Sequence, residues 1–448
     1  MIRHFILSGA LKGLEKVYDV IYVFPERDTR IKIDVNSLTL PSVRFLPVSR
    51  ARTSKLTQLA QIKTIQRSWF NPTFKQIRLA YQGVFDRRTY QKMVLLSLPL
   101  LYSVFRRKVL RAMPPFTELA DLIAETRPAV ILHPTVLHGL FISDLAAASK
   151  KANIPFVALM NSWDNPSTKA QVIRNPDWLA VWGEQTCQHA VEFMRFPRER
   201  IEILGAAQFD IYSRPAEKGR SEVAAGLDAD PSLLLILYAG SSKGIDEMEQ
   251  LLALDAAITQ GDLPPAKIIF RPHPWRDPSH ETLDFFEISW RNVVMDPSMK
   301  ENYIGPKSKG EAIIHITDYA DTHTILSACD LLIGNVSTIL LEAAMHGKPV
   351  ISFFNERDAQ NRTSHFSAVL NQRYFRELLS GLEIPLCRSI DEVILHARSL
   401  LALSRDETFS ARQRKASRYF ADQDGRTYAE RLLGFLKVVE SSHRDHIE

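Results

Sequence analysis

Short apolar runs bounded by polar, proline or glycine positions recur along most of this chain of 448 residues. Runs of this kind are typical of strands that are buried on both faces of a parallel sheet. Helix-like sequence separates them, and the alternation predicts an α/β protein with doubly wound parallel sheets. In the first half of the chain the predicted strands cover residues 3–8, 19–24, 32–35, 43–48, 129–133, 156–160, 178–182 and 201–204.

One interruption divides the pattern into two series. The segment 212–231 is polar and rich in glycine, proline and charge, which is typical of a linker. We therefore expect an N-terminal domain at 1–215, with a basic helical insert at about 52–125. A C-terminal domain is expected at 216–405, followed by helices at 406–448 that pack back on the first domain. The strands predicted in the second series are 233–239, 267–271, 293–295, 330–334, 349–354 and 384–388, with helices at 244–260, 338–346 and 391–401.

The predicted strand 267–271 ends in residues that are suited to binding an anion. Arg271 and His273 follow its apolar positions, and prolines at 272 and 274 restrict the backbone around them. A guanidinium can hold a phosphate through two hydrogen bonds, and an imidazole donates one directional bond. Ligands of parallel sheets bind beyond the carboxyl ends of the strands, so the position favours a phosphate-bearing ligand. The alternative is that Arg271 pairs with an acid and that the backbone satisfies His273.

A helix that begins at Ser337 and Thr338 supplies a second candidate. Its first backbone N–H groups lack intrahelical partners, and the helix dipole adds partial positive charge there. Either hydroxyl can cap that end or bind a phosphate oxygen. Glu342 follows one turn later on the same side, where a carboxylate can accept bonds from two ribose hydroxyls. The alternative is a capped helix with a surface glutamate.

The loop 239–244, with the sequence AGSSKG, is a third candidate and a less specific one. Its small residues allow the backbone to approach a ligand closely. Ser242 offers a hydroxyl and Lys243 a compact positive charge. The loop lacks the residue order of the Walker A motif, so it predicts phosphate binding only together with the other two candidates.

In the first series two residues are candidate general bases for an acceptor hydroxyl. Asp164 lies in the polar segment 161–169, directly after a predicted strand, and His133 ends the strand 129–133. Both positions are carboxyl ends of strands, so we expect them to line a cleft that faces the second domain. The alternatives are that Asp164 caps a turn beside Asn165 and that His133 has a structural role.

Charge is concentrated in one segment. Residues 52–111 hold thirteen Lys and Arg and one acid, a net charge of +12 in a chain whose total is +5. Within it, 91–113 has an uncharged apolar centre flanked by basic residues, which is typical of a segment that lies on an anionic membrane surface. No recognition motif for DNA or RNA is present, so we expect no nucleic-acid partner. The alternative is a buried helix with solvated basic ends.

Cysteine usage and hydropathy limit the remaining possibilities. The three cysteines are far apart and form neither a disulfide framework nor a zinc motif, which favours a reducing cytoplasm. The apolar start of the chain is interpreted as a buried strand, because a cleavage site typical of a signal peptide is missing. No apolar stretch reaches the roughly 20 residues that a spanning helix needs.

On these motifs the chain resembles the GT-B glycosyltransferases. In that superfamily two facing Rossmann-like domains with parallel sheets enclose a central cleft, and the C-terminal one holds a nucleotide donor. The element 271–274 and the turn 335–338 resemble the His-Pro and Ser/Thr motifs of bacterial capsule and teichoic-acid enzymes, including CDP-glycerol glycerophosphotransferases and bacterial sialyl- and Kdo-transferases. The stretch 341–350, LEAAMHGKPV, is similar to the ribose-binding segment of many such enzymes. The segments 161–169 and 205–210, the latter GAAQFD, resemble surface-polysaccharide biosynthesis proteins.

The resemblance implies roles for individual residues. Glu342 would hold ribose, while His273, Ser337 and Thr338 would hold the donor phosphate. The enzyme would be metal-independent and would need no cofactor, since the nucleotide-sugar is a substrate. The glycerophosphotransferases carry Thr-Asp-Tyr-Ser-Ser where this chain has Gly-Asn-Val-Ser-Thr at 334–338, and the missing acid disfavours CDP-glycerol as donor.

The expected function is therefore transfer of a sugar from a nucleotide-activated donor to a cell-surface polysaccharide, lipopolysaccharide or lipid-linked acceptor. The expected location is the cytoplasm, peripheral on the inner face of the cell membrane. Two alternatives within the superfamily are a glycerophosphotransferase of the teichoic-acid type and a non-hydrolysing sugar-nucleotide epimerase. A third is a non-catalytic scaffold or nucleic-acid-binding protein that uses the basic segment.

Overall fold

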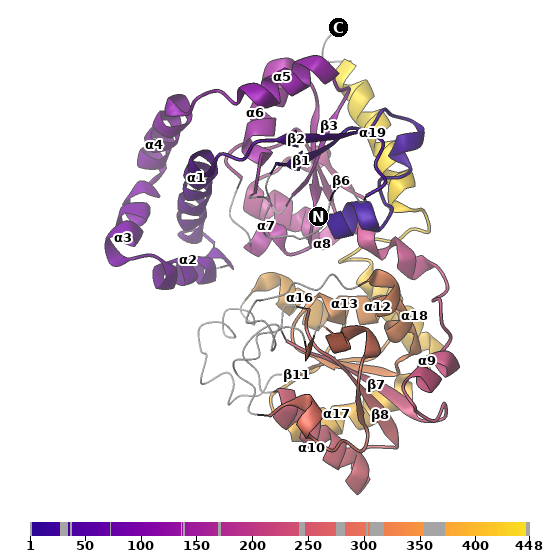
Figure 1. Cartoon of the computed structure of the whole chain (residues 1–448). Helices are drawn as coiled ribbons and strands as arrows, with labels where there is room; N and C mark the ends of the chain where they lie inside the picture. The colour runs from indigo at the N-terminus through magenta and orange to yellow at the C-terminus, as the bar shows by residue number, and fades with distance from the viewer. Residues whose placement is uncertain are drawn as a thin grey trace. The chain divides into compact units, whose positions relative to one another are not determined.

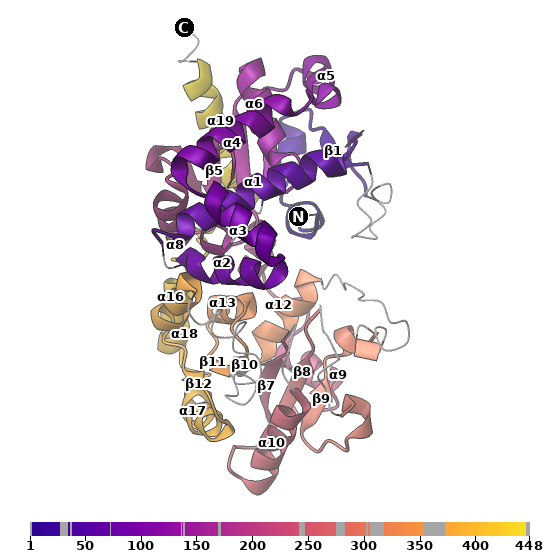
Figure 2. The same cartoon turned by 90° about the vertical axis from the view of Figure 1, so that its left-hand side faces the viewer.

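The chain folds into two compact units, each built on a parallel sheet. Unit 1 comprises Met1–Asp210, Gln372–Tyr374 and Phe420–Glu448, and unit 2 comprises Ile211–Asn371 and Phe375–Tyr419. Figures 1 and 2 show the two units from perpendicular directions. The computed structural model describes residues 2–26, 35, 38–71, 73–135, 137, 139–168, 172–241, 247–274, 283–301, 303–304, 318–353 and 372–444.

Unit 1 contains a four-stranded parallel sheet with the order β3-β4-β5-β6. The sequence of β4, FVALM, is apolar throughout, and all five of its residues are buried. A second parallel pair, β1 and β2, forms a separate sheet. The bounds are β1 Tyr22–Pro25, β2 Val43–Leu46, β3 Ile131–Thr135, β4 Phe156–Met160, β5 Trp178–Val181 and β6 Ile201–Ile203.

Successive residues of β4 point to opposite faces of the sheet, and each face carries its own apolar core. Val157 and Leu159 pack in one core with Leu432 and Phe435 of the C-terminal helix α19 (Tyr428–Arg444). The opposite core contains Phe156, Ala158 and Met160, together with residues of the helices that connect the strands. Helices α6 Ile142–Ala152 and α8 Glu184–His189 contribute to this core, while α5 Thr117–Thr126 packs in a smaller core with α6, and α7 is Asn165–Thr168.

The basic segment forms a group of four helices beside this sheet (Figure 1). Helix α1 begins after Ser49, whose side chain accepts a hydrogen bond from the backbone N–H of Arg52. Leu59, Ile62 and Ile65 of α1 are fully buried and form the centre of a separate core for the group. The four helices are α1 Arg50–Ser68, α2 Thr73–Val84, α3 Arg87–Leu96 and α4 Pro99–Ala112.

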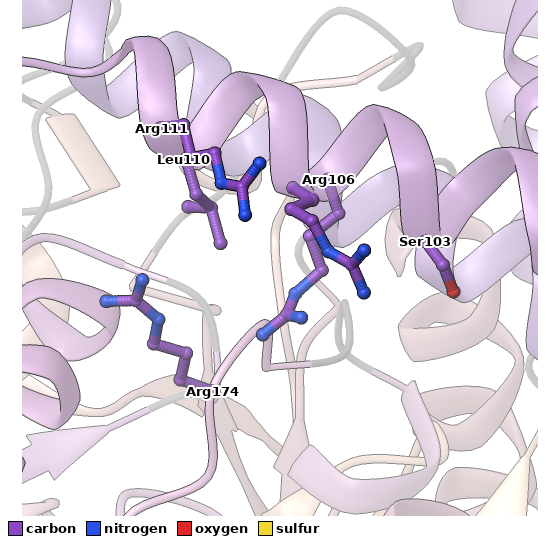
Figure 3. Close-up of a pocket in the computed structure, with 6 residues that line it drawn as sticks. Ser103, Arg106, Leu110, Arg111 and Arg174 are labelled. Atoms are coloured by element: carbon purple, nitrogen blue, oxygen red, sulfur yellow. The ribbon is translucent and has the colours of Figure 1, made fainter.

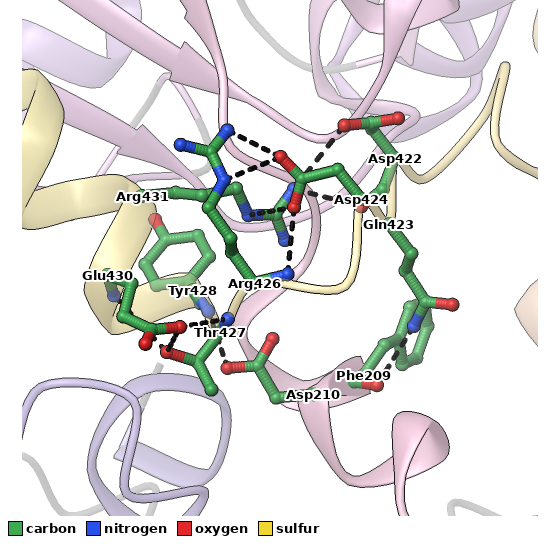
Figure 4. Close-up of polar contacts among 10 residues, drawn as sticks. All are labelled: Phe209, Asp210, Asp422, Gln423, Asp424, Arg426, Thr427, Tyr428, Glu430 and Arg431. Atoms are coloured by element: carbon green, nitrogen blue, oxygen red, sulfur yellow. Dashed lines mark hydrogen bonds and ion pairs between the residues drawn. The ribbon is translucent and has the colours of Figure 1, made fainter.

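The C-terminal helix α19 is fixed to unit 1 by polar contacts at its start, shown in Figure 4. Thr427 and Glu430 form a reciprocal capping box, in which each side chain accepts the other residue's backbone N–H at 3.2 and 2.8 Å. Asp210 accepts the N–H of Tyr428 at 2.6 Å. Buried Arg431 donates to the backbone oxygen of Asp422 at 3.2 Å. These contacts assign a structural role to the turn that ends at Asp210.

The expected strand at residues 3–8 is wrong. Residues Ile2–Leu7 form a short helix of the π type, in which only Phe5 is buried. Phe5 lies against Tyr428 with the ring centroids 6.0 Å apart, and it shares a core with Ala10 and Leu14. That spacing places one apolar stripe on a helical segment, whereas a sheet strand would bury alternate residues. The expected strand at 32–35 falls almost wholly outside the described residues.

Unit 2 contains a six-stranded parallel sheet with the order β12-β11-β10-β7-β8-β9. The chain runs from β7 outward to β9 and then restarts at β10 on the other side of β7. This is the doubly wound order, and its topological switch point lies between β7 and β10. The bounds are β7 Leu234–Ala239, β8 Ala266–Arg271, β9 Val293–Met295, β10 Leu331–Gly334, β11 Val350–Phe353 and β12 Leu386–Cys387.

Helices cover both faces of this sheet. Ile236, Ile268 and Ile333 are fully buried in a core that includes Leu251 of α10 and Val393 of α17. Helices α12 and α13 contact β7 and β10. The helices of unit 2 are α9 Arg220–Gly226, α10 Glu247–Gln260, α12 Tyr319–Ala328, α13 Thr338–Met345, α17 Ile390–Leu403 and α18 Glu407–Ser417, while α16 Arg373–Gly381 begins in unit 1 and continues in unit 2.

The predicted α/β class, with a parallel sheet in each half of the chain, is confirmed. The cysteines Cys187, Cys329 and Cys387 are buried free thiols. Within the described ranges, no helix combines the length and apolarity that would be needed to span a lipid bilayer.

We predict that Gly205→Ala destabilises the protein by about 2 kcal/mol or more. Gly205 has φ +78°, and an added Cβ would lie 2.4 Å from the Asp422 oxygen and 2.6 Å from Arg431 Nη2. Urea unfolding measures the effect. The matched control is Gly434→Ala in α19, where an added Cβ meets nothing within 4 Å. This control should stabilise by about 0.5–1 kcal/mol, because alanine is the better helix former. Equal midpoints for the two variants would contradict the assigned role of Gly205.

Candidate functional site

Three turns meet at the carboxyl edge of the unit 2 sheet. The last residues of β8, β7 and β10 are in register, with Arg271 opposite Ala239 and Ala239 opposite Gly334. At Gly334 an added Cβ would lie 3.1 Å from both the Cβ and the backbone oxygen of Ala239. Glycine therefore allows β7 and β10 to end side by side at the switch point, where doubly wound sheets bind their ligands.

The turn after β10 places two polar groups at this switch point. Asn335 is 8% exposed, and its Oδ1 has no hydrogen-bond partner among the described residues. Ser337 has extended backbone and donates its hydroxyl to the Asn335 carbonyl at 3.2 Å, so it makes no capping bond to α13. The first turn of α13, which begins at Thr338, thus keeps backbone N–H groups that Ser337 does not cap. An anion suits that helix end, and a hydroxyl or N–H donor suits Oδ1.

Arg271 lies at the predicted position, but its guanidinium is already engaged. It is buried and forms an ion pair with Asp296. Its Nη2 donates to the Thr322 hydroxyl at 3.0 Å. A guanidinium in this arrangement holds the end of β8 in place, and this is the alternative that the sequence left open for Arg271.

His273 follows in the same turn and is half-buried. Burial lowers its pKa to about 4, so the imidazole is neutral at pH 7 and carries one N–H donor. Its backbone nitrogen would lie 3.0 Å from a Cβ added at Gly240, which shows how closely the turns after β7 and β8 approach. Gly240 donates its N–H to the Arg271 carbonyl at 2.9 Å. His273 is thus held beside the turn that follows β7.

The turn after β7 is organised by a residue that was not among the predicted site residues. Glu247, in the first turn of α10, is buried and accepts the backbone N–H of Ser241. A glutamate early in a helix is favoured by the helix dipole, but its sequence position gives no sign that it contacts this turn. The predicted contacts Ser242 and Lys243 lie outside the described residues.

Glu342 belongs to a polar cluster on α13 and its surroundings. The Tyr212 hydroxyl donates to Glu342 Oε2 at 2.5 Å. The Tyr212 ring also lies 4.5 Å, centroid to centroid, from His346, and His346 Nε2 lies 2.8 Å from His323 Nδ1. Burial lowers the pKa of His346 to about 3. Tyr212 lies at the start of the segment interpreted as a linker, so the sequence did not indicate its contact with Glu342.

In unit 1, Asp164 lies directly after β4, as predicted. Its Oδ2 accepts the Thr168 hydroxyl at 2.7 Å, and its Oδ1 accepts the Asn165 side-chain N–H at 3.2 Å. Its backbone oxygen also accepts the Ser167 and Thr168 hydroxyls. Side chains of the short helix α7 thus hold the carboxylate, and the Asp164 backbone oxygen accepts the N–H groups of Ser167 and Thr168 in the first turn. The Asp164 carboxylate also contributes to the raised pKa of Tyr374, whose main cause is burial.

His133 does not lie where the sequence placed it. It is in the middle of β3, which continues to Thr135, so it is not in the loop beyond the strand end. The apolar run ends at His133, but the backbone pairing with β4 extends through Pro134 and Thr135. His133 Nε2 lies 3.1 Å from the Leu140 carbonyl, to which it donates, while Nδ1 is buried without a partner among the described residues. Burial lowers the pKa of His133 to about 4, so it is a weak base.

A metal site is not formed within the described ranges. No group of three His, Cys, Asp or Glu residues there is arranged to hold an ion.

No family model and no curated protein matches this chain. Among solved structures it is similar to the UDP-GlcNAc 2-epimerase of Neisseria meningitidis bound to UDP-GlcNAc, with 13% identity, 72% of this chain and 79% of that one covered, and a TM-score of 0.44. It is also similar to the wall teichoic acid polymerase TagF, with 12% identity, coverage of 66% and 70%, and a TM-score of 0.40. A third is Anabaena HepE in complex with UDP, with 12% identity, coverage of 72% and 81%, and a TM-score of 0.40. At these values the likeness assigns neither an activity nor a substrate to this chain.

We predict a pH-dependent stability difference between the wild type and His133→Gln. Unfolded histidine has a pKa near 6.5, above the folded value of about 4, so the unfolded state binds the extra proton. The wild-type advantage is therefore present above about pH 6.5 and is lost as the pH falls toward 4, by up to about 1.4 kcal/mol per pH unit. Urea unfolding of both proteins between pH 7 and 4.5 measures it. A difference that stays constant over this range would contradict the buried neutral state of His133.

Proposed function

We propose that this protein is a glycosyltransferase and that unit 2 binds a nucleotide-sugar donor at the switch point between β7 and β10. The observation that carries the proposal is buried Asn335 beside the start of α13, whose Oδ1 has no hydrogen-bond partner in the described part of the chain. A helix N-terminus suits phosphate oxygens, and an unpaired carbonyl oxygen suits a hydroxyl or N–H donor. A nucleotide carries phosphate oxygens together with ribose hydroxyls and base N–H groups, so it offers both kinds of group.

We assign the unit 2 residues as follows. Neutral His273 donates one hydrogen bond to the donor phosphate, and Ser337 and Thr338 bind it at the start of α13. Together they stabilise the charge that develops on the leaving nucleotide. Arg271 positions His273 through the fixed end of β8 and does not clamp the phosphate. Glu342 binds ribose hydroxyls, with Tyr212 orienting its carboxylate through the 2.5 Å bond.

Asp164 is the proposed general base for the acceptor hydroxyl. It lies in the loop after a strand, the usual place for reactive side chains in this fold class, whereas His133 lies within a strand. The bonds from Asn165 and Thr168 hold the Asp164 carboxylate in one orientation. A carboxylate that is held in this way loses little freedom when an acceptor hydroxyl binds.

The acceptor is proposed to be a cell-surface polysaccharide, lipopolysaccharide or lipid-linked saccharide that is met at the inner face of the membrane. Helix α4 supports this, because it exposes apolar side chains next to basic ones. Leu100 is 83% and Val104 65% exposed, and Arg107 is exposed one turn after Val104. Exposed apolar residues beside cations are typical of surfaces that contact anionic lipid.

The first prediction for this function is that His273→Ala and Asn335→Ala lose the response to nucleotide. At 100 times its dissociation constant, a ligand of the folded state should stabilise the wild type by about 2.7 kcal/mol. Thermal unfolding with UDP, GDP, CDP, CMP and CDP-glycerol measures the response. The matched control is His396→Ala, which changes an exposed histidine of α17 in the same unit and should keep the full shift.

If no nucleotide stabilises the wild type, the donor site is overturned. If a nucleotide-sugar is epimerised without any acceptor, the epimerase replaces the transferase. If CDP-glycerol is the one compound that raises the thermal unfolding temperature, the glycerophosphotransferase replaces the glycosyltransferase as the function.

The second prediction concerns the base. Asp164→Asn should lower kcat by about 100-fold or more, in line with the usual contribution of general base catalysis, and should leave nucleotide binding unchanged. Turnover with the acceptor and the nucleotide-dependent thermal shift are measured on the same preparation. Thr168→Val serves as a control for the hydrogen bond from Thr168, since it removes the hydroxyl that Asp164 accepts but keeps the carboxylate. Wild-type turnover in Asp164→Asn would exclude this role.

A further inference from the structure

A cavity of about 330 Å³ lies between α4 and the segment that precedes β5. Figure 3 shows labelled side chains of α4 on one side of this space and Arg174 on the other. The lining is almost entirely cationic, because it contains four arginines and only two other residues. The lining residues are Ser103, Arg106, Arg107, Leu110, Arg111 and Arg174.

None of these four arginines forms an ion pair with a carboxylate among the described residues. The acid whose charge acts on Arg174 is Asp144, but Asp144 is already held by Arg52, whose Nη2 lies 2.6 Å from its Oδ1. Burial lowers the pKa of Arg174, and the charge of Arg106 lowers it further, so the two guanidinium groups repel each other. Cations that are gathered without counter-charges favour an anionic ligand.

Side chains of the helical group fix the wall of the cavity that contains Arg174 by donating hydrogen bonds to its backbone carbonyls. Arg106 Nη2 donates to the Ile173 carbonyl at 3.1 Å, and Lys63 Nζ donates to the Val172 carbonyl at 2.6 Å. Both bonds tie the segment before Arg174 to the helical group. On the other side, Tyr102 is buried in the core of that group and fixes α4. The fold itself therefore brings the arginines together.

The chemistry of guanidinium selects among anions. Its planar fork matches two oxygens of a phosphoryl group, and several forks around one space match adjacent phosphoryl groups better than a single carboxylate. A membrane phosphodiester carries one negative charge, which leaves most of this cationic lining uncompensated. A diphosphate that is esterified at one end carries two to three charges on five free oxygens, and one that is esterified at both ends carries two charges on four.

We infer that this cavity binds the diphosphate group of the acceptor. The inference rests on the proposed function, in which unit 1 receives the acceptor, and it deepens that function by naming the acceptor's chemical class. The exposed apolar residues Leu100 and Val104 lie on the same helix as the cationic lining. A diphosphate on an amphiphile at the membrane surface fits both features, and a soluble diphosphate fits the cavity alone.

Calorimetric titration with inorganic pyrophosphate at physiological salt tests the site. The wild type should bind, and Arg174→Gln and Arg111→Gln should each bind roughly tenfold more weakly or worse, the loss expected for one charge-assisted hydrogen bond. Neither residue makes a hydrogen bond with another described residue, so both variants should fold. Lys108→Gln is the matched control, since it removes one positive charge from an exposed position of α4 outside the cavity. Unchanged binding by Lys108→Gln supports the site.

Two results would overturn the inference. One is that the wild type does not bind pyrophosphate, and the other is that Lys108→Gln weakens binding as much as Arg174→Gln, which would indicate a diffuse surface charge. His273→Ala should still bind pyrophosphate through this cavity. If it loses that binding, the anion occupies unit 2 and the assignment to unit 1 fails.

Vesicle flotation distinguishes the two sources of diphosphate. Binding to phosphatidylcholine vesicles that carry a diphosphate-headgroup lipid, with displacement by pyrophosphate, supports a membrane-bound acceptor. Pyrophosphate binding without vesicle binding supports a soluble diphosphate. Equal binding to phosphatidylglycerol vesicles that pyrophosphate does not displace would overturn the site. The same arginine variants should keep the nucleotide-dependent thermal shift, so failure of the donor site and failure of this cavity are separate outcomes.

Discussion

A charge that leaves water must be paired, and at the end of β8 this requirement decides where the neighbouring side chains lie. The buried guanidinium of Arg271 is matched by Asp296 and by the hydroxyl of Thr322. Removing one partner of such a pair typically costs about 3–5 kcal/mol, because it leaves the other charge buried alone. These contacts fix the last residue of β8 against Asp296, which follows β9, and against Thr322 of α12. This arrangement also determines the position of His273, which follows Arg271 by two residues.

The strands could be predicted where the apolar runs have sharp ends. The run at 156–160 becomes β4 with the same bounds, and 293–295 becomes β9. The prediction failed at 3–8, where a helical segment packs Phe5 against α19. The sequence near residue 5 does not indicate that the segment packs against α19, a helix that starts more than 400 residues later. Burial against a distant segment, more than local pattern, decides such elements.

The positions of the candidate site residues could be predicted more readily than their contacts. His273, Ser337 and Glu342 all follow strands that meet near the switch point, because parallel strands end at one edge. The side chains that contact these residues could not be predicted from the sequence, because they are far away along the chain. Asp296 is 25 positions from Arg271, and Tyr212 is 130 positions from Glu342. His133 shows the remaining difficulty. The apolar pattern stops at its position, but backbone pairing with β4 does not depend on apolar side chains and carries the strand two residues further.

The position of α19 in the sheet core of unit 1 has a consequence for synthesis. Leu432, Phe435 and Leu436 complete the face of the sheet that carries Val157 and Leu159. They leave the ribosome only after the whole of unit 2 has been made. Domains usually fold in the order in which they are translated. Here unit 2 can complete its core before unit 1, whose sheet keeps one apolar face uncovered until α19 packs on it. An uncovered apolar sheet is a surface through which a partly folded chain can aggregate.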